Sequence, residues 1–448
     1  MFRELVHKAH GTSLIFLYLM RYGKRLNLSE DELQFNQNRM LRNLIRFAAQ
    51  KVPYYVKLFE DLRIDPCTIQ TVEDLENLPL LGKETVRQNP EMFRPAPADS
   101  LKTLELITSG STGQATKIYH DYASLYANVA FGERERKIVL ESVNPSDFDY
   151  RELSIVYPSS ALLKMRQFYD ENTFLYLRKR RFAVSVSEPI ERICAEVNRL
   201  RPDVLVSYGS FLEYFFKLIT VRRISLALPK VVVYAGDMMT GEGKSFIEDC
   251  FGIPVFSVYN AVEVFKIGFY CKFRNGFHIH DDICHLRTIG QDGKTKPHGE
   301  TGEIVVSNLL NRGSVLLNYQ IGDRGALEKN TCPCGRKGLL LADLQGRVED
   351  LIVLPNGEIV HPRVVWGVFK GLSEILQYQL VQHDVSLFEL KMATSDKATF
   401  DRLLPSILAK LRILLGHAAR LEVFYSVELR REGKFRTVIS NVKNKGLD

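Results

Sequence analysis

The chain has 448 residues, of which 45% are hydrophobic and 25% charged, with a formal net charge of +7 at pH 7. This length exceeds one ordinary core and predicts two or more domains, while basic residues spread along the chain argue against a nucleic-acid-binding protein. The longest apolar run near the N-terminus, Leu14 to Met20, is far shorter than a membrane span and lacks a signal-peptide cleavage site. We therefore expect a cytoplasmic protein without a membrane span, whose seven cysteines are reduced thiols or metal ligands.

The first stretch, to about Phe93, is expected to be helical. Leu28 and Ser29 stand where a helix would begin, acidic residues follow in its first turn, and apolar residues recur at helical spacing from Leu33 to Ala49. The proline of VPYY, residues 52–55, then ends this helix.

From Leu101 to about Leu344 short apolar strands alternate with amphipathic helices, a pattern typical of an α/β fold. The predicted strands are LSIVYPS, DVLVSYG, KVVVYAG and IPVFSVYN, and the predicted helices include 188–200 and 241–250. Ligands collect at the carboxyl ends of strands in such folds. Those ends are Pro158, Tyr208, Gly236 and Tyr259. The section 302–344, with EIVVSNL, VLLNYQIGD and GLLLADLQ, has a more antiparallel character.

The character of the chain changes after Gly346. DLIVLPNGEIV is predicted to form a hairpin around its Pro-Asn-Gly turn. A helix, the strands LQYQLVQHD and LFELKMA, a helix over 399–415 and a last strand LEVFYSVEL follow. Together they predict a small α+β domain of about 100 residues.

A loop of hydroxyls and glycines, ITSGSTGQATKIYHD at 107–121, is the strongest single pattern. Glycines let backbone N–H groups turn toward an anion and hydroxyls add donors, as a nucleotide triphosphate requires. No Gly-Lys-Ser/Thr triplet follows, so the loop is not a Walker A motif, and Gln114 stands where a lysine would help most. Read alone, it could equally be a surface turn. The loop residues are Thr108, Ser109, Gly110, Ser111, Thr112 and Gly113.

Charged residues at four later positions accompany this loop. Glu263 lies just past a strand end, Asp323 and Arg324 follow another strand, and Lys434 follows a glycine near the C-terminus. Arg347, Glu349 and Asp350 mark the proposed domain junction. Each has an ordinary alternative, such as a surface ion pair or a solvated lysine in a turn.

In this order and across this length, the segments resemble the adenylate-forming superfamily of acyl-CoA synthetases. The most similar branch is the phenylacetate-CoA ligase family, including relatives from capsular polysaccharide gene clusters. VPYY, LENLPLLGKETVRQNPEMF, RPDVLVSYGSFL and REGKFRTVISNV also resemble that branch. The resemblance runs from about Asp31 to Val442, nearly the whole chain.

The resemblance implies an α/β fold in two domains. The large domain, 1–348, would carry stacked mixed sheets behind a helical lead-in over 1–93, and a small mobile α+β lid, 349–448, would carry Lys434. The implied reaction joins a carboxylic acid to ATP, giving an acyl adenylate and pyrophosphate, and then transfers the acyl group to CoA. Glu349 and Asp350 would form the hinge, where relatives usually carry Asp. Gln114 also departs from the usual lysine, and Asp237 from the commoner Glu.

Residue roles follow from the same resemblance. Lys434, Glu263 and Thr108 are the expected catalytic residues, with Glu263 holding Mg²⁺ and the 108–113 loop cradling the β- and γ-phosphates. The remaining nucleotide-binding residues are Asp323 on the ribose, Gly236, Asp237, Tyr259 and Asn260 around adenine, and Arg347. The expected acid pocket consists of Tyr157, Tyr208, Ala235, Gly236, Tyr259 and Ala261.

A second constellation predicts a metal site. Cys271, His278, Cys332 and Cys334 offer three thiolates and one imidazole, a set that suits closed tetrahedral zinc with a structural role. The turn KFRNGF could bring Cys271 and His278 together. Alternatively, these are buried thiols that pack as small hydrophobes. Cys250, Cys284 and His280 are substitute ligands, whereas Cys67 and Cys194 are expected in the core.

Two other functions stay open at this stage. The acyl adenylate could pass to an amine, a hydroxyl or a carrier-protein thiol instead of CoA. The chain could also be a nucleotide-binding scaffold without turnover, although the joint presence of Glu263, Asp323, Arg347 and Lys434 argues against this. A homodimer is compatible with the sequence, which does not identify an interface or the acid.

Overall fold

A computed structural model describes most of the chain, which divides into two compact units treated separately below. Unit 1 comprises 1–150, 158–182 and 256–344, and unit 2 comprises 151–157, 183–255 and 345–448. The described residues are 2–23, 28–97, 101–108, 115–143, 150–175, 180–329, 332–347, 351–360, 362–372, 374–416, 418–427, 429 and 435–442.

Unit 1 opens with helices, as expected. The helix predicted at Leu28–Ser29 is confirmed: α2 begins with a capping box in which the Ser29 hydroxyl accepts from the Glu32 N–H at 3.3 Å and the Glu32 carboxylate accepts from the Ser29 N–H at 2.9 Å. Its end at Val52 is also as expected, because Pro53 there starts a new helix. The helical elements are α1 (Phe2–Tyr22), α2 (Glu30–Lys51), α3 (Pro53–Leu62), η2 (Pro66–Thr68), η3 (Glu73–Asn77), α4 (Lys83–Gln88), η4 (Pro90–Phe93), α5 (Tyr122–Val143) and α6 (Ala161–Asn172).

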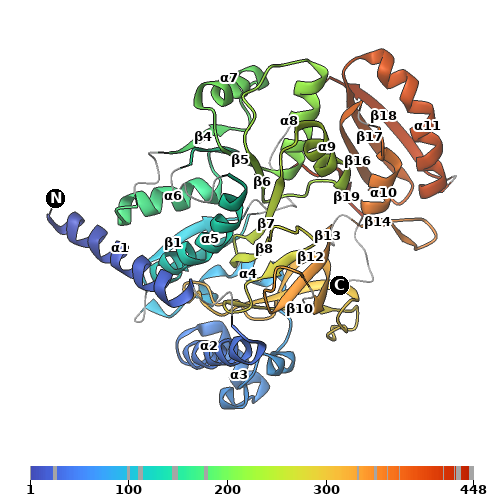
Figure 1. Cartoon of the computed structure of the whole chain (residues 1–448). Coiled ribbons are helices and arrows are strands. Elements are labelled where there is room, and N and C mark those ends of the chain that lie inside the picture. The colour runs from blue at the N-terminus through green and yellow to red at the C-terminus, as the bar shows by residue number, and fades with distance from the viewer. Residues whose placement is uncertain are drawn as a thin grey trace. The chain divides into compact units, whose positions relative to one another are not determined.

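The strands of unit 1 form an antiparallel hairpin and a larger sheet (Figure 1). The hairpin pairs β1 (Thr103–Ile107) with β2 (Lys117–Asp121). The larger sheet has the order β10-β11-β12-β13-β9-β8-β7. Its strands are β7 (Val255–Ala261), β8 (Phe265–Tyr270), β9 (Phe277–Ile279), β10 (Cys284–Ile289), β11 (Thr301–Asn308), β12 (Tyr319–Lys329) and β13 (Leu339–Arg347). The antiparallel character expected for 302–344 is confirmed by the β10–β11 and β11–β12 pairings.

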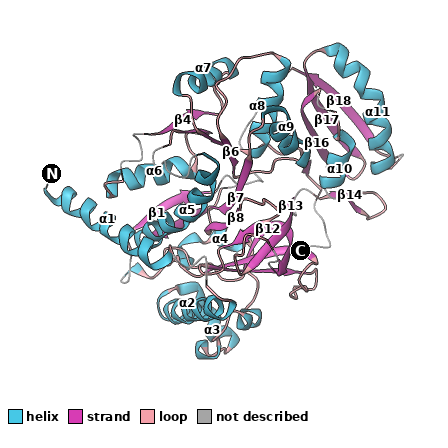
Figure 2. Cartoon of the chain, viewed as in Figure 1, coloured by secondary structure: helices cyan, strands magenta, loops and turns pink. Residues whose placement is uncertain are grey.

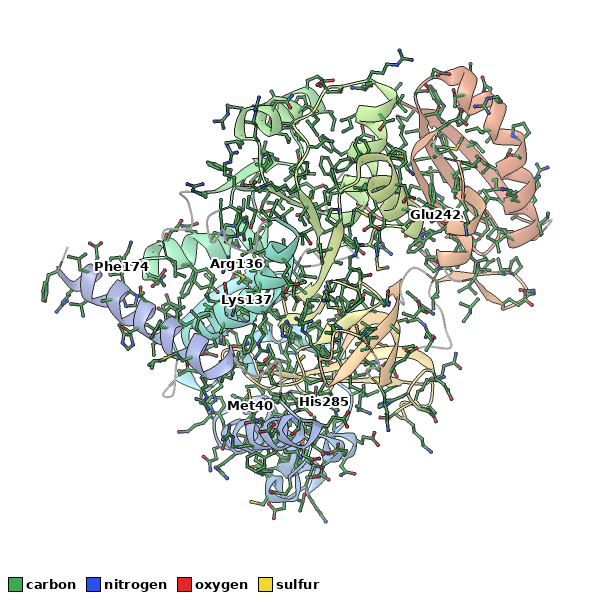
Figure 3. All side chains as sticks on the ribbon, in the orientation of Figure 1. Met40, Arg136, Lys137, Phe174, Glu242 and His285 are labelled. Carbon is green, nitrogen blue, oxygen red and sulfur yellow. The ribbon has the colours of Figure 1, made fainter. Side chains whose placement is uncertain are left out.

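Helix α2 packs on this sheet through its apolar face. Leu41 and Ala48 are fully buried in the core that the helices share with the strands. The side-chain amide of Gln37 donates to the main-chain oxygens of Asp281 and Cys284, at 2.9 and 3.0 Å, and so fixes α2 against the start of β10. Figure 3 shows Met40 on α2 and His285 on β10 at this end of unit 1.

Unit 2 contains the predicted parallel strands. Their order is β6-β5-β3-β4, with β3–β5 and β5–β6 parallel, so the predicted α/β class is confirmed. Crossover helices connect them, as a parallel sheet requires. The elements are β3 (Glu152–Val156), β4 (Arg181–Ser185), α7 (Ile190–Leu200), β5 (Val204–Ser207), α8 (Gly209–Val221), β6 (Val231–Tyr234) and α9 (Gly241–Phe251).

The C-terminal part of unit 2 has its own sheet and core (Figure 2). The predicted hairpin is confirmed as β14 (Ile352–Val353) and β15 (Ile359–Val360). The sheet order β18-β17-β16-β19 includes one strand that the sequence did not indicate, β19. The remaining elements are α10 (Pro362–Phe369), β16 (Ile375–Asp384), β17 (Leu387–Thr394), α11 (Lys397–Leu415), β18 (Arg420–Ser426) and β19 (Val438–Ser440). The compact unit joins this part to the parallel strands, and the proposed boundary at 348/349 stays a prediction.

Two sequence expectations differ from the structure. Cys67 is exposed within the short 3-10 helix η2, so its placement in the core was wrong, whereas Cys194 is buried as expected. The strand expected from Val315 starts only at Tyr319, because the preceding residues turn through Asn318 at a φ of 51°. Among the described residues no helix is long and apolar enough to cross a membrane.

Candidate active site

The hydroxyl loop closes on a pair of threonines. The Thr108 N–H donates to the Thr116 carbonyl at 2.9 Å, and the Thr116 N–H donates to the Thr108 hydroxyl at 3.0 Å. These bonds extend the β1–β2 hairpin by one step and bring both ends of the loop together. Ser109, Gly110, Ser111, Thr112, Gly113 and Gln114 lie outside the described residues.

Glu263 lies in the tight turn between β7 and β8. The turn is closed by a bond from the Val264 N–H to the Ala261 carbonyl at 3.2 Å. The Tyr319 hydroxyl donates to Oε1 of Glu263 at 3.1 Å, and Tyr319 itself is only 1% exposed. No described atom donates a hydrogen bond to Oε2 of Glu263, which leaves one carboxylate oxygen for a ligand.

His120 supports this turn, a role that the sequence did not indicate. Its ring stacks on Phe265 with centroids 3.6 Å apart, and its Nε2 lies 2.7 Å from the Val262 carbonyl. Phe265 has a φ of 66°, a conformation that costs energy for an aromatic residue and persists only when its surroundings hold it. Burial lowers the pKa of His120 to about 3, so the ring is neutral and Nε2–H donates to the carbonyl. The stacked imidazole therefore holds the turn that carries Glu263.

Asp323 is oriented by a second tyrosine. The Tyr259 hydroxyl donates to Oδ2 of Asp323 at 2.7 Å, across the sheet between β7 and β12. Gly322, with a φ of 78°, turns the chain just before Asp323, and a Cβ there would stand 2.5 Å from Nζ of Lys83. Two tyrosine–carboxylate pairs thus connect the same two strand regions of unit 1.

Asn260 carries an unsatisfied acceptor beside this pair. Its Oδ1 is buried, and no described residue donates a hydrogen bond to it. A buried amide oxygen without a hydrogen-bond donor destabilises the folded protein unless a ligand or a water molecule supplies the donor. This atom fits an amino group such as that of adenine.

In unit 2 two predicted pocket residues meet at the carboxyl ends of β3 and β5. The rings of Tyr157 and Tyr208 have centroids 5.5 Å apart, and the Tyr157 N–H donates to the Tyr208 hydroxyl at 3.4 Å. Burial raises the pKa of Tyr208 to about 12, so this hydroxyl stays protonated. Ala235, at the end of β6, donates its N–H to the Ser207 carbonyl at 3.1 Å.

Gly236 and Asp237 follow β6 in a backbone turn that needs glycine. Gly236 has a φ of 87°, where a side chain would be strained. The Asp237 carboxylate accepts from both the N–H and the hydroxyl of Ser210, and it therefore caps the first turn of α8. This structural role accompanies the predicted nucleotide-binding role of Asp237.

Three predicted positions cannot be placed. Lys434 and the hinge residues Glu349 and Asp350 lie outside the described residues, while Arg347 is the last residue of β13.

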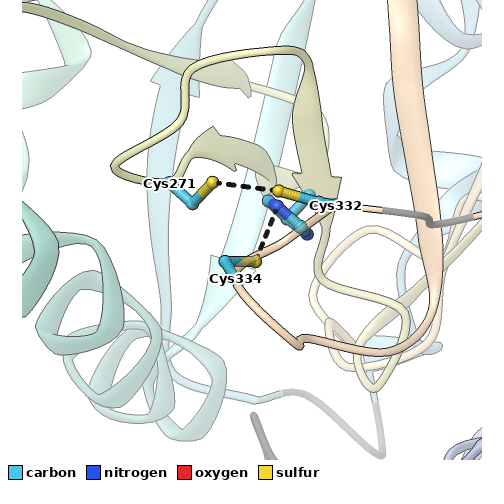
Figure 4. A group of neighbouring side chains, drawn as sticks. Cys271, Cys332 and Cys334 are labelled. Atoms are coloured by element: carbon cyan, nitrogen blue, oxygen red, sulfur yellow. Dashed lines mark hydrogen bonds between the residues drawn. The ribbon is translucent and has the colours of Figure 1, made fainter.

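The structure brings the four predicted metal ligands together in unit 1. Cys271 follows β8, His278 lies in β9, and the predicted turn between them is a hairpin with Tyr270 opposite Phe277. Figure 4 shows the thiols of Cys271, Cys332 and Cys334 converging. The ligand atoms of all four residues lie within 4.8 Å of one another.

The distances in this cluster suit a tetrahedral ion. Sγ of Cys271 lies 3.5 Å from Sγ of Cys332, and Sγ of Cys334 lies 3.4 Å from Nε2 of His278. Zinc bonds of about 2.3 Å to sulfur and 2.0 Å to nitrogen give tetrahedral edges of roughly 3.5 to 3.8 Å. Two of the six ligand–ligand distances are close to these edges, and the donor set of three sulfurs and one nitrogen suits a closed zinc site.

The protonation states of His278 and Cys334 favour metal binding, whereas burial raises the pKa of Cys332 to about 12 and keeps that thiol protonated until an ion binds. Burial, followed by the charge of Arg336, lowers the pKa of His278 to about 4, which leaves the imidazole neutral. Burial alone would raise the pKa of Cys334, but hydrogen bonds from Arg336 outweigh it and the pKa is lowered. The substitute ligands lie elsewhere: Cys284 donates to the His280 carbonyl, and Cys250 is exposed on α9 in unit 2.

Comparisons with known proteins agree with this picture. No family model matches the chain. A phenylacetate-coenzyme A ligase of Thermus thermophilus is 24% identical over 84% of the chain and 85% of that protein. Protein CapK of Staphylococcus aureus is 19% identical over 94% of the chain and 92% of that protein. The crystal structure of a 2-hydroxyisobutyryl-CoA ligase, in the postadenylation state with R3-HIB-AMP, has a TM-score of 0.75 and 16% identity, covering 94% of this chain and 92% of that chain.

The fold of the chain is therefore that of the adenylate-forming ligase with which it aligns over nearly its whole length. By sequence, the chain is similar to phenylacetate-coenzyme A ligases and to protein CapK.

Proposed function

We propose that this protein activates a carboxylic acid with ATP and transfers the acyl group to CoA. The observation that carries the proposal is the unsatisfied Oδ1 of Asn260 next to Tyr259, whose hydroxyl orients Asp323. An amide acceptor for the adenine amino group and a fixed carboxylate for two ribose hydroxyls are the contacts that an adenosine nucleotide needs. The curated relatives support the acid and the thiol, because three of them are phenylacetate-coenzyme A ligases.

The first step forms the acyl adenylate. A carboxylate oxygen of the acid attacks the α-phosphorus of ATP, the bond from this phosphorus to the bridging oxygen breaks, and pyrophosphate leaves with the electron pair. Lys434 takes the role of stabilising the charge on the carboxylate and α-phosphate oxygens, and the 108–113 loop holds the β- and γ-phosphates. Positioning and charge stabilisation supply most of the acceleration.

Glu263 is the residue that would hold Mg²⁺. Its Oε2, to which no residue of the described ranges donates a hydrogen bond, and its bond from Tyr319 suit a cation ligand that must keep one orientation. When bound, the ion neutralises phosphate charge. In unit 1 the task of His120 is to keep Phe265 and the Glu263 turn in place.

The second step forms the thioester. The sulfur of CoA, which loses its proton to solvent, attacks the carbonyl carbon of the acyl adenylate, the bond from this carbon to the phosphate oxygen breaks, and AMP leaves with the electron pair. Rotation of the lid about Glu349 and Asp350 would exchange Lys434 for a surface that admits the thiol. Tyr157, Tyr208, Ala235, Gly236, Tyr259 and Ala261 are proposed to bind the acid.

We further propose that the Cys271, His278, Cys332 and Cys334 cluster holds structural zinc. Four protein ligands leave no open position for catalysis. The site would join the β8–β9 hairpin to the segment before β13. A reducing compartment such as the cytoplasm keeps these thiols available.

Acid-dependent exchange between labelled pyrophosphate and ATP tests adenylation across a panel of aryl and alkyl acids. Exchange is expected with at least one acid. In Lys434→Ala the exchange rate should fall 100-fold or more, on the order expected when a charge contact in the transition state is lost. Lys410→Ala, an exposed lysine on α11, is the matched control and should leave exchange unchanged. Exchange that survives Lys434→Ala unaltered would refute the role of that lysine, and no exchange with any acid would favour a non-catalytic scaffold.

The acceptor is tested separately. Mass spectrometry of reactions that contain free CoA should find the acyl thioester and AMP. Exchange without thioester formation, but with product on an added amine, hydroxyl or carrier-protein thiol, would replace CoA by that acceptor.

A further inference from the structure

Helix α1 exposes a continuous apolar face that the adenylation chemistry does not use. Figure 1 shows α1 at the edge of unit 1, with its N-terminal end extending past the neighbouring helices. The large apolar side chains on this face and their exposed fractions are Phe2 80%, Leu5 50%, Val6 54%, Phe16 62%, Leu17 55% and Met20 55%.

The opposite face of α1 is firmly docked, so this exposure does not come from a loose helix. Gly11 approaches so closely that a Cβ there would lie 2.3 Å from the Asn172 carbonyl. Lys8 donates to the Asp170 carbonyl at 2.7 Å, and the Thr12 hydroxyl accepts from the Phe174 N–H at 2.9 Å. Ile15 is 2% exposed. The apolar face therefore points away from unit 1 on a rigid support.

The spacing on the exposed face is that of a helix–helix seam. Its positions alternate in steps of four and three, as in coiled coils, with small residues at the middle. The Ser13 hydroxyl donates to the Ala9 carbonyl of its own helix at 2.9 Å, so it needs no outside partner. The seam consists of Phe2, Val6, Ala9, Ser13, Phe16 and Met20, flanked by Leu5 and Leu17.

The same face is symmetric about residue 11. Reversing the helix places position 2 over 20, 5 over 17, 6 over 16 and 9 over 13, and each of these positions is exposed and apolar or small. A surface that matches its own reverse is what an isologous two-fold interface requires, because each residue meets the partner's counterpart in both directions.

The area also suits a pair of chains. Taking about 200 Å² for a fully exposed side chain of this size, the six large residues expose roughly 700 Å². That exceeds the largest patch of a typical monomer, about 300–600 Å², and approaches the roughly 800 Å² per partner of a stable interface.

Charge opposes the pairing only weakly. Arg3, His10 and Arg21 lie along one edge of the face, and the antiparallel arrangement brings Arg3 near Arg21 of the partner subunit. Exposed like charges at this spacing repel modestly, and salt screens them. Burial of the apolar seam outweighs this repulsion.

We infer that α1 is a homodimerisation helix, which pairs antiparallel with α1 of a second copy across a two-fold axis near residue 11. The 448-residue chain therefore forms a dimer of twice its 51.3 kDa mass, and the interface is independent of adenylation.

Sedimentation equilibrium of the full chain at 1–50 μM tests the interface. Wild type should be dimeric. The Phe16→Glu/Leu17→Glu variant should be monomeric, with a dimer dissociation constant at least 100-fold higher than that of wild type. Ile413→Glu, which charges an 83% exposed side chain on α11, should stay dimeric. Because the altered residues are exposed, the variant should keep the far-UV circular dichroism of the folded chain, while its Tm falls at a given concentration because the dimer no longer stabilises it. A wild-type monomer at 50 μM, or a dimer that survives Phe16→Glu/Leu17→Glu, would overturn the inference.

Cross-linking tests the register. Under mild oxidation Leu5→Cys/Leu17→Cys should form a covalent dimer, whereas Leu5→Cys alone should match wild type, since the two positions lie about 18 Å apart along one helix. Cross-linking of Leu5→Cys alone would refute the antiparallel arrangement.

Salt separates a second copy from a lipid surface. Raising NaCl from 50 to 500 mM should tighten the dimer, whereas binding of basic Arg3 and Arg21 to anionic phosphatidylglycerol vesicles would weaken. If wild type is a monomer that binds such vesicles at low salt, and the Phe16→Glu/Leu17→Glu variant does not bind them, the apolar face is a lipid-binding surface and the dimer is refuted.

Discussion

Replacing Asp282 by asparagine is expected to destabilise unit 1 strongly. Asp282 forms a two-pronged ion pair with Arg134 of α5, at 2.8 Å from Nη1 to Oδ1 and 2.7 Å from Nη2 to Oδ2. Both side chains are only 3% exposed. The same guanidinium donates to the Tyr22 carbonyl at 2.6 Å, so the pair also ties the end of α1 to the core.

The magnitude follows from burial. Asp282→Asn keeps the shape but removes the charge, and its amide nitrogen would face a guanidinium N–H donor. Leaving a buried charge without its partner costs about 3–5 kcal/mol. Glu133→Gln on the same helix breaks the more exposed pair with Arg136, and should cost less than about 1 kcal/mol.

Urea unfolding followed by circular dichroism measures the loss. With a slope near 3 kcal/mol/M or above for this chain length, the unit 1 midpoint should fall by about 1 M. The single tryptophan, Trp366, lies in unit 2 and reports on that unit separately. The double variant Arg134→Met/Asp282→Leu should recover much of the stability, because apolar replacements of a buried pair are often neutral. A loss for Asp282→Asn no larger than that of Glu133→Gln would refute the reasoning.

Three further outcomes are expected. His120→Phe should reduce the loss of unfolding free energy at acidic pH. The pKa of His120 is about 3 in the folded chain and 6.5 in the unfolded chain, so the unfolded chain binds the extra proton. Wild type should therefore lose about 2 kcal/mol of unfolding free energy between pH 7 and pH 5, measured by urea titration. Cys332→Ser should lower zinc from one ion per chain to near zero by elemental analysis. Asp323→Asn should raise the KM for ATP about 10- to 100-fold in the exchange assay, as for loss of a charged hydrogen bond.

Matched substitutions control these experiments. His383→Gln, at an exposed histidine, should leave the pH slope unchanged; an equal change would mean that His120 is not the group. Cys67→Ser, at an exposed cysteine, should keep the metal, and wild-type protein without zinc would disprove the site. Asp401→Asn, in a surface pair on α11, should leave the KM unaltered, and an unchanged KM in Asp323→Asn would remove Asp323 from nucleotide binding.

Local chemistry made much of the fold predictable. Ser29 and Glu32 define a helix start through their own bonds, and runs such as KVVVYAG form buried parallel strands because β-branched residues pack well there. The approach of Cys271 to His278 could be predicted as well, since the turn after Cys271 is short and its hairpin returns the chain to His278.

Long-range partners were not predictable in the same way. Tyr319 and Tyr259 are ordinary strand tyrosines in the sequence, and their bonds to Glu263 and Asp323 join positions 56 and 64 residues apart. His120 stacks on a residue that follows it by more than a hundred positions, in a conformation that no local signal announces. Strand β19 is short and pairs with β16 through only three positions, too little for a periodic pattern.

An ion in the proposed Cys271, His278, Cys332 and Cys334 site would also change the unfolded chain. Cys271 and Cys332 are 61 positions apart, and the segment between them includes Tyr319 and Asp323. An ion bound at both ends would close this segment into a loop and remove conformational entropy from the unfolded state. For a cross-link of that length the effect is about 4 kcal/mol, which would stabilise a strand that holds two of the residues proposed to bind or position the nucleotide and its metal.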